Sequence, residues 1–212
     1  DNCRFKAGVS IGNGVKIGSD CHFHFNVTIE DDSVIGNHCT IQPGAVIGSE
    51  GFGFQPNQEN NYQKLYHIGN VVLEDHVEIG ANTTVDRGTI GSTIIRKGVK
   101  LDNLIQVGHN VEIGENTVAA AQTGIAGSTI IGKNCMFGGQ VGFAGHQKIA
   151  DGVKLAAKSG VQGNIVEENS IQQGAPAFPV MDYKKSYVYF RKLPKLASDI
   201  NDLKKEIKNL KS

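Results

Sequence analysis

Residues 95–166 read, in blocks of six, IRKGVK LDNLIQ VGHNVE IGENTV AAAQTG IAGSTI IGKNCM FGGQVG FAGHQK IADGVK LAAKSG VQGNIV. The first residue of every block is apolar, and glycine or alanine often follows it. A short fixed period held over such a length has to be interpreted as an architecture before any single residue is. The stretch therefore predicts a repeat protein.

These blocks resemble the hexapeptide repeat of the left-handed parallel β-helix. The resemblance implies that three hexads form one triangular coil, so residues 18 apart stack at about the inter-strand spacing of ~4.8 Å. The same six-residue period runs from Phe5 to Ile47 and resumes at Leu73. Glycine makes up 27 of 212 residues, well above the usual ~7%, which fits a tight corner every six residues. We predict an all-β left-handed parallel β-helix with a C-terminal α-helical extension.

Two domains are expected, the β-helix at residues 1–178 and a helical tail at 179–212. Residues 49–66 interrupt the repeat with glycine, proline, asparagine and aromatic residues, so we expect an ejected loop, either a binding lid or a loop packed on its own neighbour. A four-residue slip is expected at 91–94. Pro194 should divide the tail. The apolar residues beyond it have the spacing of a self-association seam: Leu196, Ile200, Leu203, Ile207 and Leu210.

The charge pattern argues against a nucleic-acid partner, because Lys+Arg and Asp+Glu both number 21. The tail is basic, however, with nine basic and three acidic side chains in residues 183–212. No apolar run reaches the ~18 residues of a membrane span. Cys3, Cys21 and Cys39 are 18 apart and are interpreted as small core residues rather than a disulfide or metal site. The chain begins at Asp1 in mid-pattern, so we expect a segment of a longer protein.

The 18-residue stacking brings candidate catalytic residues to one corner of the coil. His109 falls two places after Val107, where a side chain points outward, and His146 lies near the same corner two coils later. Gly127 lies one coil above His109, with its N–H beside the imidazole. A base next to an unobstructed backbone donor is what acyl transfer needs. We therefore predict His109 as general base, Gly127 N–H as oxyanion donor and His146 as an auxiliary residue.

A second column, Gly124, Gly142 and Gly160, forms a strip without side chains that can receive an acyl chain or a pantetheine arm. Asp86 is expected near Gly108 if the slip is looped out, and two roles stay open for it: orienting His109 or capping a turn. The remaining histidines are interpreted as surface residues: His22, His24, His38, His67 and His76.

Several segments together resemble UDP-3-O-acylglucosamine N-acyltransferase, the LpxD family of lipid A biosynthesis. They are LDNLIQVGHNV (101–111), the GFGF loop (51–54), TTVDRG (83–88), FGGQ (137–140) and Gly145-His146. The resemblance implies a cytoplasmic homotrimer that moves a 3-hydroxyacyl group from acyl carrier protein to the 2-amine of UDP-3-O-acylglucosamine. It agrees with His109 and His146 as the active-site histidines. Candidate substrate-binding residues in these segments are Phe52, Phe54, Asp86, Asn103 and Gln106.

No cofactor or metal is expected, because the acyl donor is carried on the phosphopantetheine arm of the carrier protein. The basic tail is a candidate dock for that acidic partner. Nothing here corresponds to the N-terminal uridine-binding domain of the family. Three alternatives remain: a CoA-dependent acetyltransferase acting on another amino-sugar nucleotide, a non-catalytic trimeric β-helix, and a zinc-dependent γ-carbonic anhydrase. The last lacks a third histidine after His146, where position 151 is Asp151.

Overall fold

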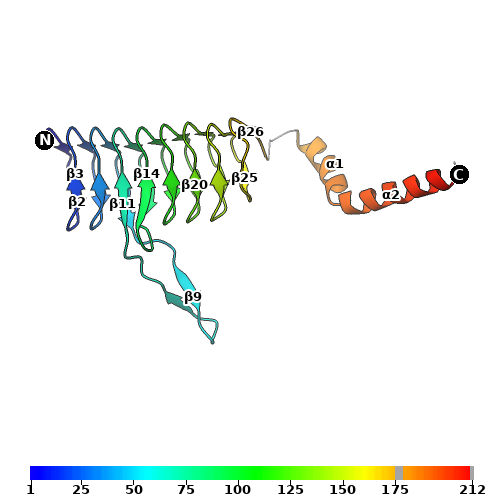
Figure 1. Ribbon diagram of the computed structural model, residues 1–212, viewed down its shortest axis with the longest axis horizontal. Coiled ribbons are helices and arrows are strands. Elements are labelled where there is room, and N and C mark those ends of the chain that lie inside the picture. The colour runs from blue at the N-terminus through cyan, green and yellow to red at the C-terminus, as the bar shows by residue number, and fades with distance from the viewer. Residues whose placement is uncertain (175–178, 211–212) are drawn as a thin grey trace. The chain divides into compact units, whose positions relative to one another are not determined.

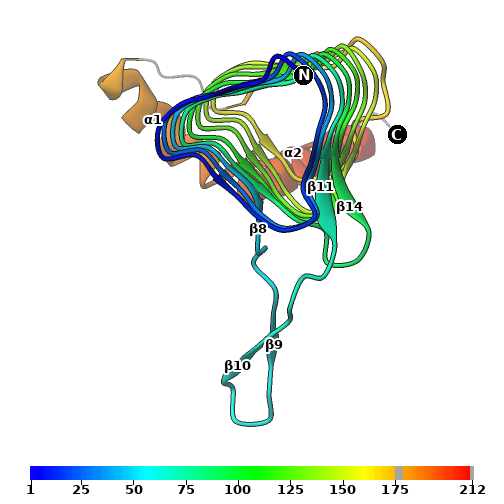
Figure 2. The same ribbon diagram turned by 90° about the vertical axis from the view of Figure 1, so that its left-hand side faces the viewer.

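The computed structural model describes residues 1–174 and 179–210. It confirms the left-handed parallel β-helix, built from three parallel sheets that form the sides of a triangular coil (Figures 1 and 2). The chain separates into two compact units, Asp1–Ala175 and Pro176–Ser212. The predicted domain boundary after residue 178 falls among residues 175–178, outside the described part of the chain.

Sheet A contains nine strands, stacked in chain order. They are β1 (Arg4–Phe5), β4 (His22–Phe23), β7 (Thr40–Ile41), β12 (Glu78–Ile79), β15 (Lys100–Leu101), β18 (Val118–Ala119), β21 (Met136–Phe137), β24 (Lys154–Leu155) and β26 (Ile171–Gln172).

Sheet B contains eight strands. They are β2 (Ser10–Ile11), β5 (Thr28–Ile29), β8 (Val46–Ser49), β13 (Thr84–Asp86), β16 (Gln106–Val107), β19 (Gly124–Ile125), β22 (Gly142–Phe143) and β25 (Gly160–Val161).

Sheet C contains seven strands. They are β3 (Lys16–Ile17), β6 (Val34–Ile35), β11 (Asn70–Leu73), β14 (Ser92–Ile95), β17 (Glu112–Ile113), β20 (Ile130–Ile131) and β23 (Lys148–Ile149).

The hexad explains these short strands. Its apolar residue points inward in nearly every coil and is buried, as at Ile41, Ile79 and Ile113, while the residue before it points outward because side chains alternate along a strand. Three places after the apolar residue the backbone takes a positive φ, often at asparagine, as at Asn116 (φ 56°), since asparagine tolerates this conformation. The buried cysteines Cys21, Cys39 and Cys135 join this core as free thiols.

Regular coils stack with the predicted offset of 18, as in the bond from Ser19 N–H to Asn37 Oδ1. Two insertions lengthen the offset without shifting the register. It becomes 38 between Asn37 and Asp75 and 22 between Ala81 and Asn103. The slip predicted at 91–94 was misplaced, because residues 92–95 form β14 and the extra residues lie just before it.

Residues 50–69, between β8 and β11, leave the coil and carry the antiparallel hairpin β9 (Phe54–Pro56) and β10 (Tyr62–Lys64). The hairpin projects from the corner between sheets B and C (Figure 2). This segment is called the excursion below. The loop predicted at 49–66 thus contains a hairpin, and the chain rejoins the coil at Asn70.

The described part of the second unit contains α1 (Val180–Phe190) and α2 (Leu193–Leu210). The two helices are separated just before Pro194. Pro194 lies in the first turn of α2, where a backbone N–H has no partner within the helix, so the missing N–H of proline costs nothing. All described residues of both helices are exposed. Within the described residues, no helix has the length and apolar character needed to cross a membrane.

Candidate active site

The corner between sheets B and C brings His109, Gly127 and Gly145 together in successive coils, as their spacing predicted. Ser128 N–H donates to His109 O at 2.8 Å, and His146 N–H donates to Gly127 O at 3.0 Å. These ladder bonds hold adjacent coils in register. This corner is called the BC corner below.

The imidazole of His109 lies directly against Gly127. A Cβ atom built on Gly127 would overlap Nε2 of His109 and come within 2.7 Å of Cε1. Gly127 has no positive φ, so contact with the ring, and not backbone conformation, requires glycine here. Nε2 is thereby placed at the edge of the residue whose N–H was predicted as oxyanion donor.

The other ring nitrogen of His109 is held by two polar side chains. Nδ1 lies 3.2 Å from Asn110 Oδ1 and 3.3 Å from Thr89 Oγ1. The Asn110 amide is oriented by its own bonds, because Oδ1 accepts from Thr89 N–H and Nδ2 donates to Ile90 O. A fixed acceptor at Nδ1 favours the tautomer with the proton on Nδ1. Nε2 is then unprotonated and able to accept a proton.

The N–H of Gly127 has no acceptor among the described residues. At five other corners the equivalent N–H donates to an Asp or Asn side chain of a later coil: Asp31, Asn37, Asp75, Asn103 and Asp151. The residue that would supply this cap for Gly127 is Gly145. A backbone donor without an acceptor is therefore available on the residue that His109 Nε2 contacts.

A groove of about 910 Å³ runs along sheet B beside His109. Gln106, Gly124, Gly142 and Gly160 pair in register across β16, β19, β22 and β25, which confirms the predicted glycine column. Nothing lies within 4 Å of a Cβ built on any of the three glycines. Gly124 and Gly142 line this groove, whereas Gly160 lines a neighbouring hollow of about 270 Å³.

Asp86 lies near His109 but has no hydrogen bond to it among the described residues. It is 8% exposed, and it accepts hydrogen bonds from Ser49 Oγ at 2.8 Å and Gln106 Nε2 at 3.0 Å. Burial raises the pKa of its carboxyl, and the two hydrogen bonds partly offset that rise. Asp86 therefore ties the start of the excursion to sheet B, beside His109 rather than bonded to it.

The surface position predicted for His67 is wrong. His67 is 6% exposed, and its ring packs edge-on against that of His109, with 5.1 Å between ring centroids and 60° between planes. His67 belongs to the excursion, whose path carries no repeat, so hexad spacing did not place it. The available signal was the glycine pair Gly51 and Gly53, both of which lie against this ring.

Two aromatic residues of the excursion line the groove. Phe52 and Phe54 both line it and contact each other edge-on at 5.0 Å. Lys64 lies over the Phe54 ring at 5.4 Å and pairs with Glu50 at 3.2 Å. One mouth of the groove therefore combines aromatic rings with a cation.

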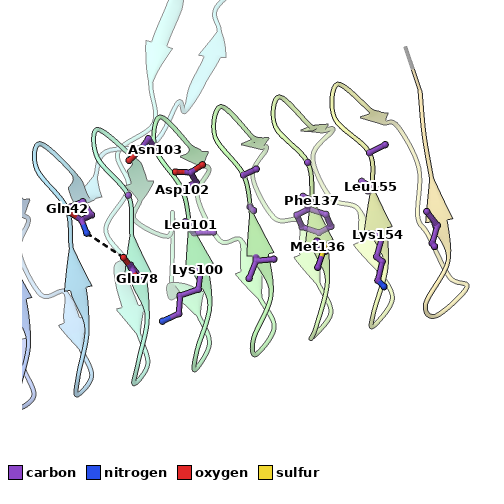
Figure 3. A pocket seen from close by; sticks show the side chains of 17 residues that line it. Gln42, Glu78, Lys100, Leu101, Asp102, Asn103, Met136, Phe137, Lys154 and Leu155 are labelled. Atoms are coloured by element: carbon purple, nitrogen blue, oxygen red, sulfur yellow. Dashed lines mark hydrogen bonds between the residues drawn. The ribbon is translucent and has the colours of Figure 1, made fainter. Parts of the chain in front are cut away.

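Asn103 and His146 lie outside the groove. Asn103 is on the corner between sheets A and B, where its Oδ1 caps Ala81 N–H at 2.7 Å. It borders a separate groove of about 870 Å³ over sheet A, with Lys100, Met136 and Lys154 (Figure 3). His146 is on the BC corner, but its ring is exposed and does not line the site. Within the described residues, no group of three or more His, Cys, Asp or Glu side chains is arranged to hold a metal ion.

The sequence is similar to known protein families and to individual curated proteins. Residues 14–49 match the family described as bacterial transferase hexapeptide (six repeats), and residues 128–166 match the hexapeptide repeat of succinyl-transferase. The UDP-3-O-acylglucosamine N-acyltransferase of Christiangramia forsetii is 58% identical over 164 residues, covering 77% of this chain and 48% of the relative. That of Pseudomonas aeruginosa is 49% identical over 181 residues, covering 85% and 51%.

Solved structures agree on the fold. A UDP-N-acetylglucosamine acyltransferase from Francisella novicida superimposes with a TM-score of 0.68 at 19% identity, over 87% of this chain and 71% of that one. LpxA from Moraxella catarrhalis gives 0.62 at 23% identity, over 82% and 70%. The chain spans about half the length of the curated relatives it matches. Over the part that aligns, the chain belongs to the UDP-3-O-acylglucosamine N-acyltransferase family of hexapeptide-repeat proteins.

Proposed function

We propose that this chain carries the acyl-transfer site of an N-acyltransferase that moves a 3-hydroxyacyl group from acyl carrier protein to the 2-amine of UDP-3-O-acylglucosamine in lipid A biosynthesis. The observation that carries the proposal is the pairing of His109 Nε2 with the uncapped N–H of Gly127 beside an open groove. The names of the curated relatives supply the acceptor sugar and the N-acyl transfer.

The proposed reaction needs no covalent enzyme intermediate. The sugar amine attacks the thioester carbonyl carbon, and Nε2 of His109 accepts the proton that the nitrogen loses. Negative charge on the carbonyl oxygen is stabilised by the Gly127 N–H. When the carbon–sulfur bond breaks, the imidazolium returns the proton to the leaving thiolate. The hydrogen bond at Nδ1 to Asn110 keeps the ring in the tautomer that this cycle requires.

The groove on sheet B suits the two reactants. The strip Gly124, Gly142 and Gly160 offers room for an acyl chain or pantetheine arm, while Phe52 and Phe54 lie at the excursion end for the acceptor. The donor is carried by the carrier protein, so no separate cofactor is included. His146 is retained as an auxiliary residue near the same corner.

The assembly proposed is a cytoplasmic homotrimer. Exposed apolar side chains on sheet A, such as Met136 at 53% exposure beside the groove of Figure 3, are the kind of surface that a second copy covers. The exposed seam Leu196, Ile200, Leu203, Ile207 and Leu210 on α2 supports self-association of the tail. The basic side chains of the tail form the proposed dock for the acidic carrier protein.

The test is mass spectrometry of UDP-3-O-acylglucosamine incubated with acyl-loaded carrier protein and the complete protein. The expected result is acceptor mass increased by one 3-hydroxyacyl group, lost in His109→Ala and kept in His76→Ala, a control histidine exposed in the described structure. Transfer only from acetyl-CoA to another amino-sugar nucleotide would instead assign an acetyltransferase. Full activity in His109→Ala would remove the proposed mechanism.

A further inference from the structure

The His67 ring has a feature that the proposed chemistry leaves unused. It is a buried imidazole, and neither ring nitrogen has a hydrogen-bond partner among the described residues. Buried polar atoms are nearly always paired, and exceptions in native structures call for a functional explanation. The ring packs edge-on against that of His109, with 5.1 Å between centroids.

The excursion is shaped around this ring. A Cβ on Gly53 would lie 2.5 Å from His67 Cε1, and a Cβ on Gly51 would lie 2.9 Å from Nε2 and 3.3 Å from the Cβ of His109. Neither glycine has a positive φ, so backbone conformation does not require glycine at either position. Lack of space does, because a Cβ at either position would meet the His67 ring, and a Cβ on Gly53 would also lie 2.9 Å from the backbone oxygen of Leu65.

The backbone around His67 is fixed on both sides. His67 N–H donates to Glu50 Oε1 at 3.3 Å, and Leu65 N–H donates to Gly53 O at 2.9 Å. Ile68 N–H donates to Thr89 O at 3.0 Å, and Thr89 Oγ1 in turn lies 3.3 Å from His109 Nδ1. The segment that carries His67 is therefore bonded to the same residue that contacts Nδ1 of His109.

Four residues then surround the His109 ring. Thr89 and Asn110 contact Nδ1, Gly127 lies against Nε2, and His67 packs edge-on against the ring. We propose that His67 is a positioning residue of the acyl-transfer site: its ring, inserted from the excursion through the Gly51–Gly53 slot, keeps the His109 imidazole in the rotamer that places Nε2 beside Gly127. This inference rests on the proposed function of His109.

If His67 acts through packing, substitutions of His67 should lower kcat according to how well the new side chain fills the slot. His67→Ala leaves a void beside His109 and lets its ring rotate, which should lower kcat about 10- to 100-fold, because small misplacement of a catalytic group is costly. The KM for the sugar should change little. His67→Phe refills the slot with a flat ring that lacks nitrogens, and it should retain several-fold more kcat than His67→Ala.

The experiment combines steady-state kinetics with NMR of ¹³C-histidine-labelled complete protein. In the wild type the His109 Cε1–H resonance should be displaced by the ring current of His67, and this displacement should vanish in His67→Ala. The matched control is His76→Ala, which removes a ring that stacks on His38 at 4.8 Å, away from His109. It should leave both kcat and the His109 resonance unchanged.

The two readouts separate failure of this inference from failure of the proposed function. A protein with no acyl transfer but with a displaced His109 resonance would refute the function and keep the contact. Wild-type kcat in His67→Ala, an unmoved His109 resonance, or equal losses in His67→Phe and His67→Ala would each overturn the positioning role.

Discussion

The imidazole of His109 occupies the space that a Cβ atom on Gly127 would fill. The two residues are one coil apart, so the contact follows from the 18-residue stacking. The contact places a proton acceptor, His109 Nε2, next to the residue that carries the backbone donor, Gly127, and both belong to the same stack of paired coils. Residues built on regular elements hold their geometry better than residues on loops.

Gly127→Ala should therefore displace the His109 ring without unfolding the coil. We expect kcat to fall about 100-fold, because displacing a catalytic base by about 1 Å can cost that much, with the thermal midpoint changed little. The matched control is Gly163→Ala on the same corner, where nothing lies within 4 Å of the added Cβ. Equal activity of the two variants in the mass-spectrometric assay would contradict the contact.

Asn110→Gly tests the tautomer. Glycine accepts the φ of 56° at this position, so the backbone is kept. The variant loses the acceptor at His109 Nδ1, together with the side-chain bonds to Thr89 N–H and Ile90 O. We expect kcat to fall about 10-fold or more at unchanged KM. Asn116→Gly, which has the same φ of 56° on another corner, is the control for the backbone change. If both variants lose activity equally, the Nδ1 bond is not what matters.

Gly145→Asn should silence the Gly127 N–H without touching His109. At five corners an Asp or Asn of a later coil caps the equivalent donor, with distances such as 2.9 Å from Lys133 N to Asp151 Oδ1. The same bond at residue 145 would compete with the oxyanion. We expect kcat to fall about 100-fold, whereas Gly145→Ala, which adds a Cβ but no acceptor, should lose much less. Similar losses in both variants would point to crowding instead.

The repeat period allowed the columns to be predicted, and the breaks in it revealed the insertions, but it could not predict the path of the chain within them. His109 with Gly127, and Gly124 with Gly142, were placed correctly because vertical alignment depends only on counting hexads. His67 could not be placed this way, because the excursion has no period and its path is set by tertiary packing.

Residues with two possible roles were also hard to assign from sequence. Asn110 has the positive φ typical of a turn asparagine. Its turn position explained its presence, so nothing in the sequence indicated its bond to His109. Asn103 sits in the segment that resembles the family, but its side chain caps a corner of the coil. Asp86 was placed correctly by register, yet its partners Ser49 and Gln106 depend on where the excursion begins.

Gly160→Met tests whether the glycine strip receives the acyl chain. Nothing lies within 4 Å of a Cβ at this position, so the new side chain should occupy open space above sheet B rather than disturb the core. We expect kcat/KM to shift toward shorter acyl donors in a chain-length series. Gly163→Met, on the neighbouring corner, should keep the wild-type preference. An unchanged preference in Gly160→Met would remove the strip from the acyl path.

Asp86→Asn should reveal the cost of burying a carboxylate beside His109. Burial raises the pKa of Asp86 in the folded state, so ionisation is harder in the folded chain than in the unfolded one. Below the unfolded-state pKa both states are protonated and the residue costs nothing. As pH rises through the folded-state pKa, the wild type loses stability that the uncharged variant does not lose.

The measurement is urea unfolding of both proteins between pH 3 and 8, at one protein concentration. The stability of Asp86→Asn relative to wild type should increase as pH rises. Asp75→Asn should do the opposite, because the hydrogen bond from Asn37 N–H lowers the pKa of Asp75, and its ionised form therefore stabilises the folded chain above the unfolded-state pKa. A pH-independent difference for Asp86→Asn would show that the lost hydrogen bonds, and not buried charge, dominate at this position.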